Sequence, residues 1–275
     1  MKHRRAGLLM GLAGAVLGSV IALVAWAPAA WLATALASAT GQRLLLADAR
    51  GTVWNGSAVP VLTGGIGSRD ASALPGRLQW QLSLAGAGLL VTARHACCIN
   101  GDMRLLLRPG FGRLRIELPP APGGQPIGQW PAAWLAGLGT PWNTLQPSGS
   151  LQLSTPGLAL ENVQGRWLVE GRADLALNAF ASRLSTLDVL GSYNLVLTGA
   201  PLRTAANAAA GDAGATLQLF TTSGALLLQG QGQWVASKLR FNGEASAAPG
   251  SETVLNNLLN IIGRRQGARS VISIG

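Results

Sequence analysis

The feature that most constrains this fold is an alternation of apolar and polar residues, which runs through most of the chain after residue 43. A period of two is typical of antiparallel strands with one face in a core and one in water. Glycine and proline interrupt the alternation about every 8–15 residues, as turns between short strands do. The clearest apolar sets are Leu78-Trp80-Leu82-Leu84, Leu114-Ile116-Leu118, Leu151-Leu153, Ala173-Leu175-Leu177 and Tyr193-Leu195-Leu197. The pattern predicts an all-β domain, either an antiparallel sandwich or a curved open sheet.

Two short helices are expected within this domain. One follows Pro131, which suits a first helical turn. The other covers residues 254–262, where Ser251 can cap the start and Gly263 can end the helix. The apolar stripes of the two helices are Trp130-Trp134-Leu138 and Leu255-Leu258-Leu259-Ile262. The first helix lies in the proline-rich stretch 119–147, which is a candidate boundary between two β modules because proline cannot donate to a sheet ladder.

The amino terminus combines a basic head with a long uncharged stretch. Residues 1–5 include Arg4 and Arg5, and no charged residue occurs from position 6 to position 42. The densest apolar part, residues 6–27, is long enough as a helix to cross a hydrocarbon core of about 30 Å. We therefore predict a single transmembrane anchor, with the basic head in the cytoplasm.

Two tryptophans mark the far side of this predicted anchor. Trp26 and Trp31 stand where indole rings favour the membrane interface. Residues 28–42 are then a juxtamembrane linker or a surface helix, and residues 43–275 form a periplasmic β-rich domain. A cleaved signal peptide is the alternative, although its apolar region would be unusually long and Pro28 would follow the small residues at the cut.

Composition argues against catalysis and against nucleic-acid binding. The chain has 275 residues, of which 48% are hydrophobic and 12% charged, with a net charge of +10. The basic residues are nearly all arginine and are spread singly, without interleaved stacking aromatics. Two histidines, eleven acids and no G-x-S-x-G, H-E-x-x-H or phosphate-loop motif leave no recognisable catalytic set. We expect no enzyme activity, no cofactor, no metal and no nucleic-acid partner.

Cys97-Cys98 is the most unusual local feature. In an oxidising compartment the two thiols are candidates for a vicinal disulfide, and the alternative is two buried thiols on a strand. His95 would share a face with Cys97 in an extended chain, which brings three potential metal ligands together. Adjacent cysteines are nevertheless poor partners for one tetrahedral metal, so a metal site is disfavoured.

Several segments resemble the type II secretion system protein N family. The early motif is G-T-V-W-N-G at 51–56, after the basic head and the apolar stretch. The carboxyl end supplies G-Q-G-Q-W at 230–234, L-R-F-N-G-E-A at 239–245 and L-L-N-I-I-G-R-R at 258–265. The similarity covers nearly the whole chain. It implies a single-pass inner-membrane subunit of the machine that exports folded periplasmic proteins, acting through contacts with other subunits.

Two functions follow from these observations. The first is a membrane-anchored scaffold or connector, for which sheet-edge pairing is one binding mode and Trp54 and Asn55 are candidate partner contacts. The second is a lipid-binding or lipid-transfer module in which a leucine-rich sheet forms a hydrophobic groove. A scaffold should have a dry, filled core, whereas a lipid carrier needs a continuous open apolar surface.

Overall fold

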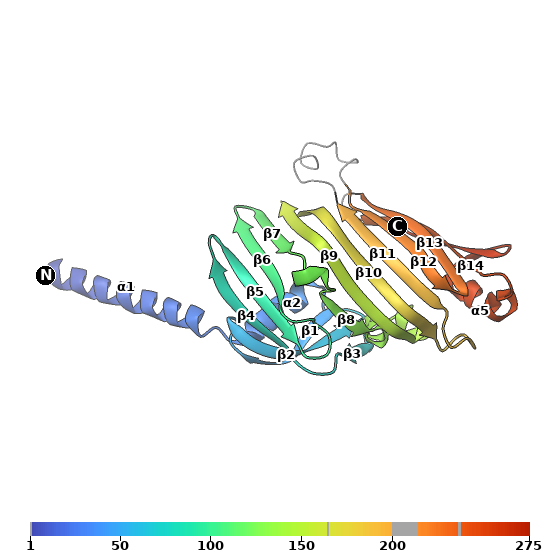
Figure 1. The fold of residues 1–275 in the computed structure, drawn as a ribbon. Coiled ribbons are helices and arrows are strands. Elements are labelled where there is room, and N and C mark those ends of the chain that lie inside the picture. The colour runs from blue at the N-terminus through green and yellow to red at the C-terminus, as the bar shows by residue number, and fades with distance from the viewer. Residues whose placement is uncertain (1, 164, 200–213, 236–237) are drawn as a thin grey trace.

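The protein folds as one twisted antiparallel sheet with short helices against it (Figure 1). The computed structural model describes residues 2–163, 165–199, 214–235 and 238–275, and for residues 2–13, 166, 235 and 238 it describes the backbone alone. The all-β prediction is confirmed. Of the two architectures considered, the described chain forms an open sheet of 16 strands rather than two packed sheets.

The first half of the chain contains two helices followed by seven strands. Helix α1 projects away from the sheet at the end that carries the first strands (Figure 1). No helix among the described residues is both long enough and apolar enough to cross a membrane. The elements are α1 (Lys2–Ala25), α2 (Ala29–Ala39), β1 (Leu44–Gly51), β2 (Asn55–Thr63), β3 (Ala71–Ala73), β4 (Leu78–Ala85), β5 (Gly88–His95), β6 (Met103–Gly110) and β7 (Arg113–Leu118).

The second half contains the longest strands and closes with a helix and two short strands. The elements between β7 and β9 are η1 (Pro122–Gly124), β8 (Gly128–Pro131), η2 (Ala132–Leu138) and α3 (Trp142–Leu145). The remaining elements are β9 (Pro147–Val163), β10 (Arg166–Ser182), β11 (Gly191–Gly199), β12 (Thr216–Gly224), β13 (Leu226–Val235), β14 (Lys238–Ala247), α5 (Glu252–Ile262), β15 (Arg264–Gln266) and β16 (Arg269–Ile274).

Strand order follows chain order almost throughout, as β1-β2-β4-β5-β6-β7-β9-β10-β11-β12-β13-β14-β16-β15. The 17-residue strand β9 makes the sheet continuous across the proline-rich stretch 119–147. Its second half pairs with β7, from Leu158 to Val163, and its first half pairs with β8, from Ser150 to Leu153. The strands on both sides of the stretch are therefore parts of a single hydrogen-bonded sheet.

The register of the ladders keeps the alternating apolar residues on one face. Residues directly opposite each other in an antiparallel pair point to the same side of the sheet. The paired positions Leu82–Val91, Val91–Leu105, Leu107–Ile116, Ile116–Leu160, Leu160–Val169, Leu175–Leu195 and Leu195–Leu219 carry this face across the sheet. We call it the apolar face, and the opposite side, with most of the charged residues, the polar face.

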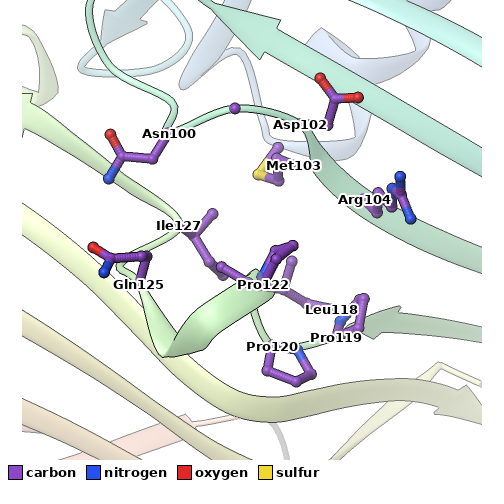
Figure 2. A pocket seen from close by; sticks show the side chains of 12 residues that line it. Asn100, Asp102, Met103, Arg104, Leu118, Pro119, Pro120, Pro122, Gln125 and Ile127 are labelled. Atoms are coloured by element: carbon purple, nitrogen blue, oxygen red, sulfur yellow. The ribbon is translucent and has the colours of Figure 1, made fainter.

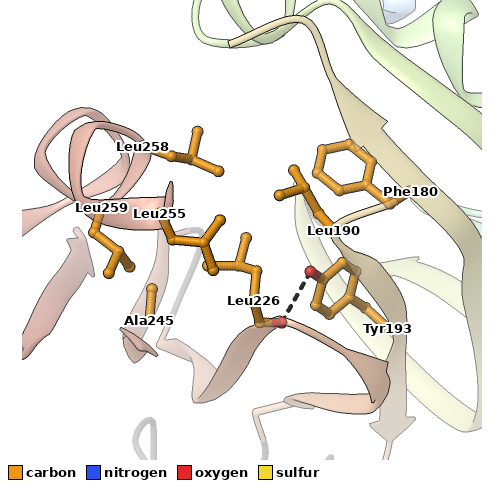
Figure 3. Close-up of a cluster of buried hydrophobic side chains, with 8 residues drawn as sticks. All are labelled: Phe180, Leu190, Tyr193, Leu226, Ala245, Leu255, Leu258 and Leu259. Carbon is orange, nitrogen blue, oxygen red and sulfur yellow. Dashed lines mark hydrogen bonds between the residues drawn. The ribbon is translucent and has the colours of Figure 1, made fainter. Parts of the chain in front are cut away.

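Helices bury the two ends of the apolar face in separate clusters. At the amino-terminal end, α2 packs Ala29 against Leu46, Ala58 and Trp80. At the other end, α5 buries Leu255, Leu258 and Leu259 against residues from β10, β11, β13 and β14 (Figure 3). The Tyr193 hydroxyl in this second cluster donates a hydrogen bond of 3.0 Å to the carbonyl of Leu226. Burial raises the pKa of Tyr193, so the phenol stays protonated and keeps this donor.

The two predicted helices are present with changed details. The segment after Pro131 forms a 3-10 helix rather than an α-helix, and Gly137 within it lies directly against the backbone of Leu62 and Ser72. Helix α5 covers the predicted stripe, but among the described residues the Ser251 side chain makes no capping hydrogen bond. Gly263 ends the helix in an extended conformation instead of a left-handed one. Its backbone lies against Val271 of β16, so sheet contact rather than local turn chemistry ends the helix.

Replacing Leu259 by alanine should destabilise the fold strongly. The Leu259 side chain is fully buried between α5 and the sheet. Its removal leaves a cavity that lowers the free energy of unfolding by about 2–5 kcal/mol. Ile261 on the same helix is 56% exposed, so Ile261→Ala should change the free energy of unfolding by about 0.5 kcal/mol or less. Urea unfolding of the full chain in mild detergent measures both values, and equal losses would contradict this assignment of the core.

Candidate functional site

The G-T-V-W-N-G turn between β1 and β2 clasps the end of helix α1. The Trp54 indole Nε1 donates a hydrogen bond of 2.7 Å to the carbonyl of Val24, the last turn of that helix. The backbone N–H of Val53 donates to the carbonyl of Ala27 at 2.8 Å. Trp80 supports the turn from the sheet, since its Nε1 donates to the carbonyl of Val53 at 3.0 Å. The turn therefore fixes where the amino-terminal helix leaves the sheet.

The two residues predicted as partner contacts have different surroundings. Trp54 is half-buried against the chain's own helix, whereas Asn55 is exposed. The glycine at position 56 has a packing reason, because a side chain there would meet the Trp80 ring and the carbonyls of Arg50 and Thr52. The motif is thus a compact structural clasp around one aromatic donor.

The predicted anchor flanks are only partly described. Trp26 and Trp31 are both largely exposed on either side of Pro28. Arg4 and Arg5 belong to the part of α1 whose side chains lie outside the described residues. The two indoles are thus available at the point where α1 gives way to α2.

Trp54→Phe should loosen this junction. The change keeps the aromatic ring but removes the donor to Val24, a loss of about 1 kcal/mol for one neutral hydrogen bond. We expect faster proteolysis of the full-length chain between α1 and α2. Trp31→Phe is the matched control, because the structure shows no hydrogen bond from that indole within the described residues. Equal cleavage rates in the two variants would contradict the role given to Trp54.

The Cys97-Cys98 pair forms the turn that follows β5, and the structure joins the two sulfurs in a disulfide. Cys98 is buried, and its carbonyl accepts a hydrogen bond of 3.0 Å from the Gln129 N–H. The His95 ring beside it is also buried, and neither of its nitrogens finds a hydrogen-bond partner among the described residues. One ring nitrogen of His95 and the Sγ atoms of Cys97 and Cys98 lie within 4.8 Å of one another. A disulfide has no thiolate to offer a metal, so in this state the group is a structural turn rather than a ligand set.

His95 should make the fold sensitive to mild acid. Burial lowers the pKa of His95 below its usual value near 6.5, so between the two values the unfolded chain binds the additional proton. The free energy of unfolding therefore has its full value above about pH 6.5. It decreases as the pH falls from there towards the lower pKa that His95 has in the folded chain. His95→Leu should reduce the loss of stability between pH 7.5 and 5.5, measured by urea unfolding. An unchanged pH dependence would show that another group causes it.

A cavity of about 480 Å³ lies next to this turn (Figure 2). It opens between the loop that leads into β6 and the proline-rich loop after β7. Asp102 on its edge is held by an ion pair with Arg94, which keeps the pKa of Asp102 below its usual range. The sequence does not reveal this cavity, because its two walls, 100–104 and 118–127, are brought together only by the folding of the sheet. The labelled lining residues are Asn100, Asp102, Met103, Arg104, Leu118, Pro119, Pro120, Pro122, Gln125 and Ile127.

The polar face carries an ion-pair network centred on Arg115 of β7. Its guanidinium contacts Glu117 at 2.7 Å on the same strand, Glu161 at 3.6 Å on β9 and Glu170 at 3.0 Å on β10. All four side chains are half-buried, so solvent screens these pairs less than it screens fully exposed ones. The network ties three neighbouring strands together at the centre of the sheet.

The apolar face at the centre of the sheet contrasts with its two covered ends. Its side chains are half-buried, and among the described residues they belong to neither of the buried clusters. The apolar surface extends to the hairpin tips, where Leu84 is 80% exposed, Phe111 is fully exposed and Trp167 is 52% exposed. The central residues on this face are Leu89, Val91, Leu105, Leu107, Ile116, Leu158, Leu160 and Val169.

A family model described as type II secretion system (T2SS), protein N matches residues 42–272. The match covers the G-T-V-W-N-G turn, α5 and the sheet from β1 to Ile272 in β16. The chain belongs to this family. Family membership implies association with other components of the type II secretion system. No curated protein and no solved structure matches the chain.

Proposed function

We propose that this chain is an inner-membrane-anchored connector of the type II secretion system. Family membership carries the proposal. The connector would act in the export of folded periplasmic proteins across the outer membrane, through contacts with other subunits rather than through catalysis. The long sheet supports this role, because it offers an extended rigid surface for partners.

The proposed anchor is residues 6–27, with the amino terminus in the cytoplasm and residues 43–275 in the periplasm. Support comes from the uncharged stretch behind a basic head, and from the exposed indoles of Trp26 and Trp31 at its end. The clasp at Trp54 adds a mechanical argument. A helix bonded to the sheet through Val24 would hold the sheet in a defined orientation at the membrane.

The sheet edges are poorly suited to pairing with a partner strand. At one edge, β1 is interrupted by a register shift between Ala47 and Arg50, and Asp48 adopts a positive φ of 49° there. At the other edge, β15 has only three residues. Interrupted and very short edge strands are ways in which proteins block edge-to-edge pairing. A side-chain surface is therefore the better candidate for contacts with other subunits.

The polar face of β12, β13 and β14 offers such a surface. Phe220 is exposed on it, in a shallow hollow of about 690 Å³. An exposed aromatic side chain surrounded by amides is the composition expected of a protein contact, with an apolar anchor and a polar rim. The polar side chains around Phe220 are Gln218, Gln229, Gln231, Asn242 and Glu244.

Two variants and one truncation test the connector role in a strain that depends on this secretion system. Full-length chain, purified in mild detergent, should recover other secretion subunits, and a chain cut to residues 1–42 should not. Phe220→Asp should lower both recovery and secretion by about tenfold, since losing an interface anchor costs at least 1–2 kcal/mol. Gln233→Asp, which adds the same charge on the same face of β13, is the control. The proposal would be overturned if a strain that lacks this chain secreted normally and if no secretion subunit were recovered with the purified full-length chain.

A further inference from the structure

The central part of the sheet is a single layer whose apolar face lacks a cover within the described chain. Helix α2 covers the first strands, and α5 covers the last ones. Between them, the central residues of this face on β5, β6, β7, the second half of β9 and the start of β10 are leucine, isoleucine and valine, and Asn162 and Trp167 lie on the same face beside the β9–β10 turn. A contiguous, partly exposed apolar surface that ends in exposed hairpin tips is typical of a binding site in a folded protein.

The strip has an open end at one rim of the sheet. Four turns lie at this rim, and they join β1 to β2, β4 to β5, β6 to β7 and β9 to β10. They share one rim because every strand runs antiparallel to its neighbours in the sheet. Leu84, Phe111 and Trp167 project there from three successive hairpins. Helix α1 joins the same rim through the Trp54 clasp. The apolar strip therefore begins beside the point where the amino-terminal helix is attached.

The chemistry of the strip favours hydrocarbon over protein. A protein partner needs about one hydrogen bond per 100–200 Å² of interface, and the eight aliphatic side chains at the centre of the strip can neither donate nor accept one. Acyl chains need none. At the rim, exposed Arg113 stands two residues from Phe111, so a cationic group adjoins the apolar tip where a phosphate headgroup would lie.

The dimensions of the strip fit an acyl chain. Four inter-strand spacings separate β5 from β10 in the sheet. At about 4.8 Å per spacing the strip is about 19 Å across. One leaflet of a bilayer is about 15 Å of hydrocarbon, so the strip accommodates an extended acyl chain lying across the strands. We propose that the apolar face between α2 and α5 binds the acyl chains of membrane phospholipids, which enter at the rim of Leu84, Phe111 and Trp167.

The first experiment locates the lipid on the unmodified protein. Full-length chain is incorporated into vesicles of phosphatidylethanolamine and phosphatidylglycerol that contain phosphatidylethanolamine with a diazirine in its acyl chain. After photolysis, peptide mapping should find adducts on β6, β7 and β9, in addition to α1. Adducts confined to α1 and the hairpin tips would show contact with the bilayer surface alone and would overturn the proposal. Cross-links between two copies across β6 or β9 would overturn it too, because a second copy would then cover the face.

The second experiment uses paired variants on opposite faces of the same strands. Leu107→Glu and Val169→Glu place a carboxylate on the apolar face, whereas Leu106→Glu and Leu168→Glu place it on the polar face. Within β6 and β9, the first pair should lower adduct yield about tenfold, because an unpaired charge is costly in hydrocarbon. The control pair should stay within about twofold. Circular dichroism melting checks that each variant folds, and equal labelling by folded variants of both pairs would contradict the proposal.

Discussion

Strand β9 is the element on which the rest of the molecule depends. Its whole length bonds to β10 on one side, and on the other side it bonds first to β8 and then to β7. Both halves of the chain therefore share one register. Because side chains alternate with a period of two, a slip of one residue in this strand would turn its leucines to the polar face. The apolar face and both helix-covered ends require that this register hold.

The distribution of buried contacts divides the sheet into two firm ends and a thin centre. The ends have packed clusters under α2 and α5. The centre has backbone ladders and, on the polar face, the Arg115 network across β7, β9 and β10. Surface ion pairs contribute little individually, but a half-buried network restrains the strands that it bridges. Within the described residues, the thin centre is thus held mainly from its polar side, which leaves its apolar side available to a ligand.

Three surfaces of the sheet can serve different tasks without competing. The rim receives α1 through Trp54, the polar face presents Phe220, and the apolar face presents the leucine strip. A connector in a membrane complex needs an attachment point and a contact surface. Lipid bound on the third surface would cover the leucines without blocking the other two. The proposed secretion role and the proposed acyl-chain site are therefore compatible in one molecule.

Much of this architecture was predictable from sequence, and the reason is local. Alternation predicted the strands, the stripe ending at Ile262 predicted α5, and the motifs at 51–56 and 258–265 indicated the family. Other features depend on distant partners and were not predictable. Residues 29–39 form a helix that packs on the sheet, the segment at Gly137 tightens to a 3-10 helix against Leu62, and Trp54 bonds to α1.

By itself, the sequence determined that each strand has one apolar side, because that property depends only on every second residue. What covers that side was decided by the tertiary structure. A sandwich and an open sheet demand the same alternation, and they differ only in whether a second layer lies opposite. Here short helices cover the ends and the described chain supplies no second layer for the centre.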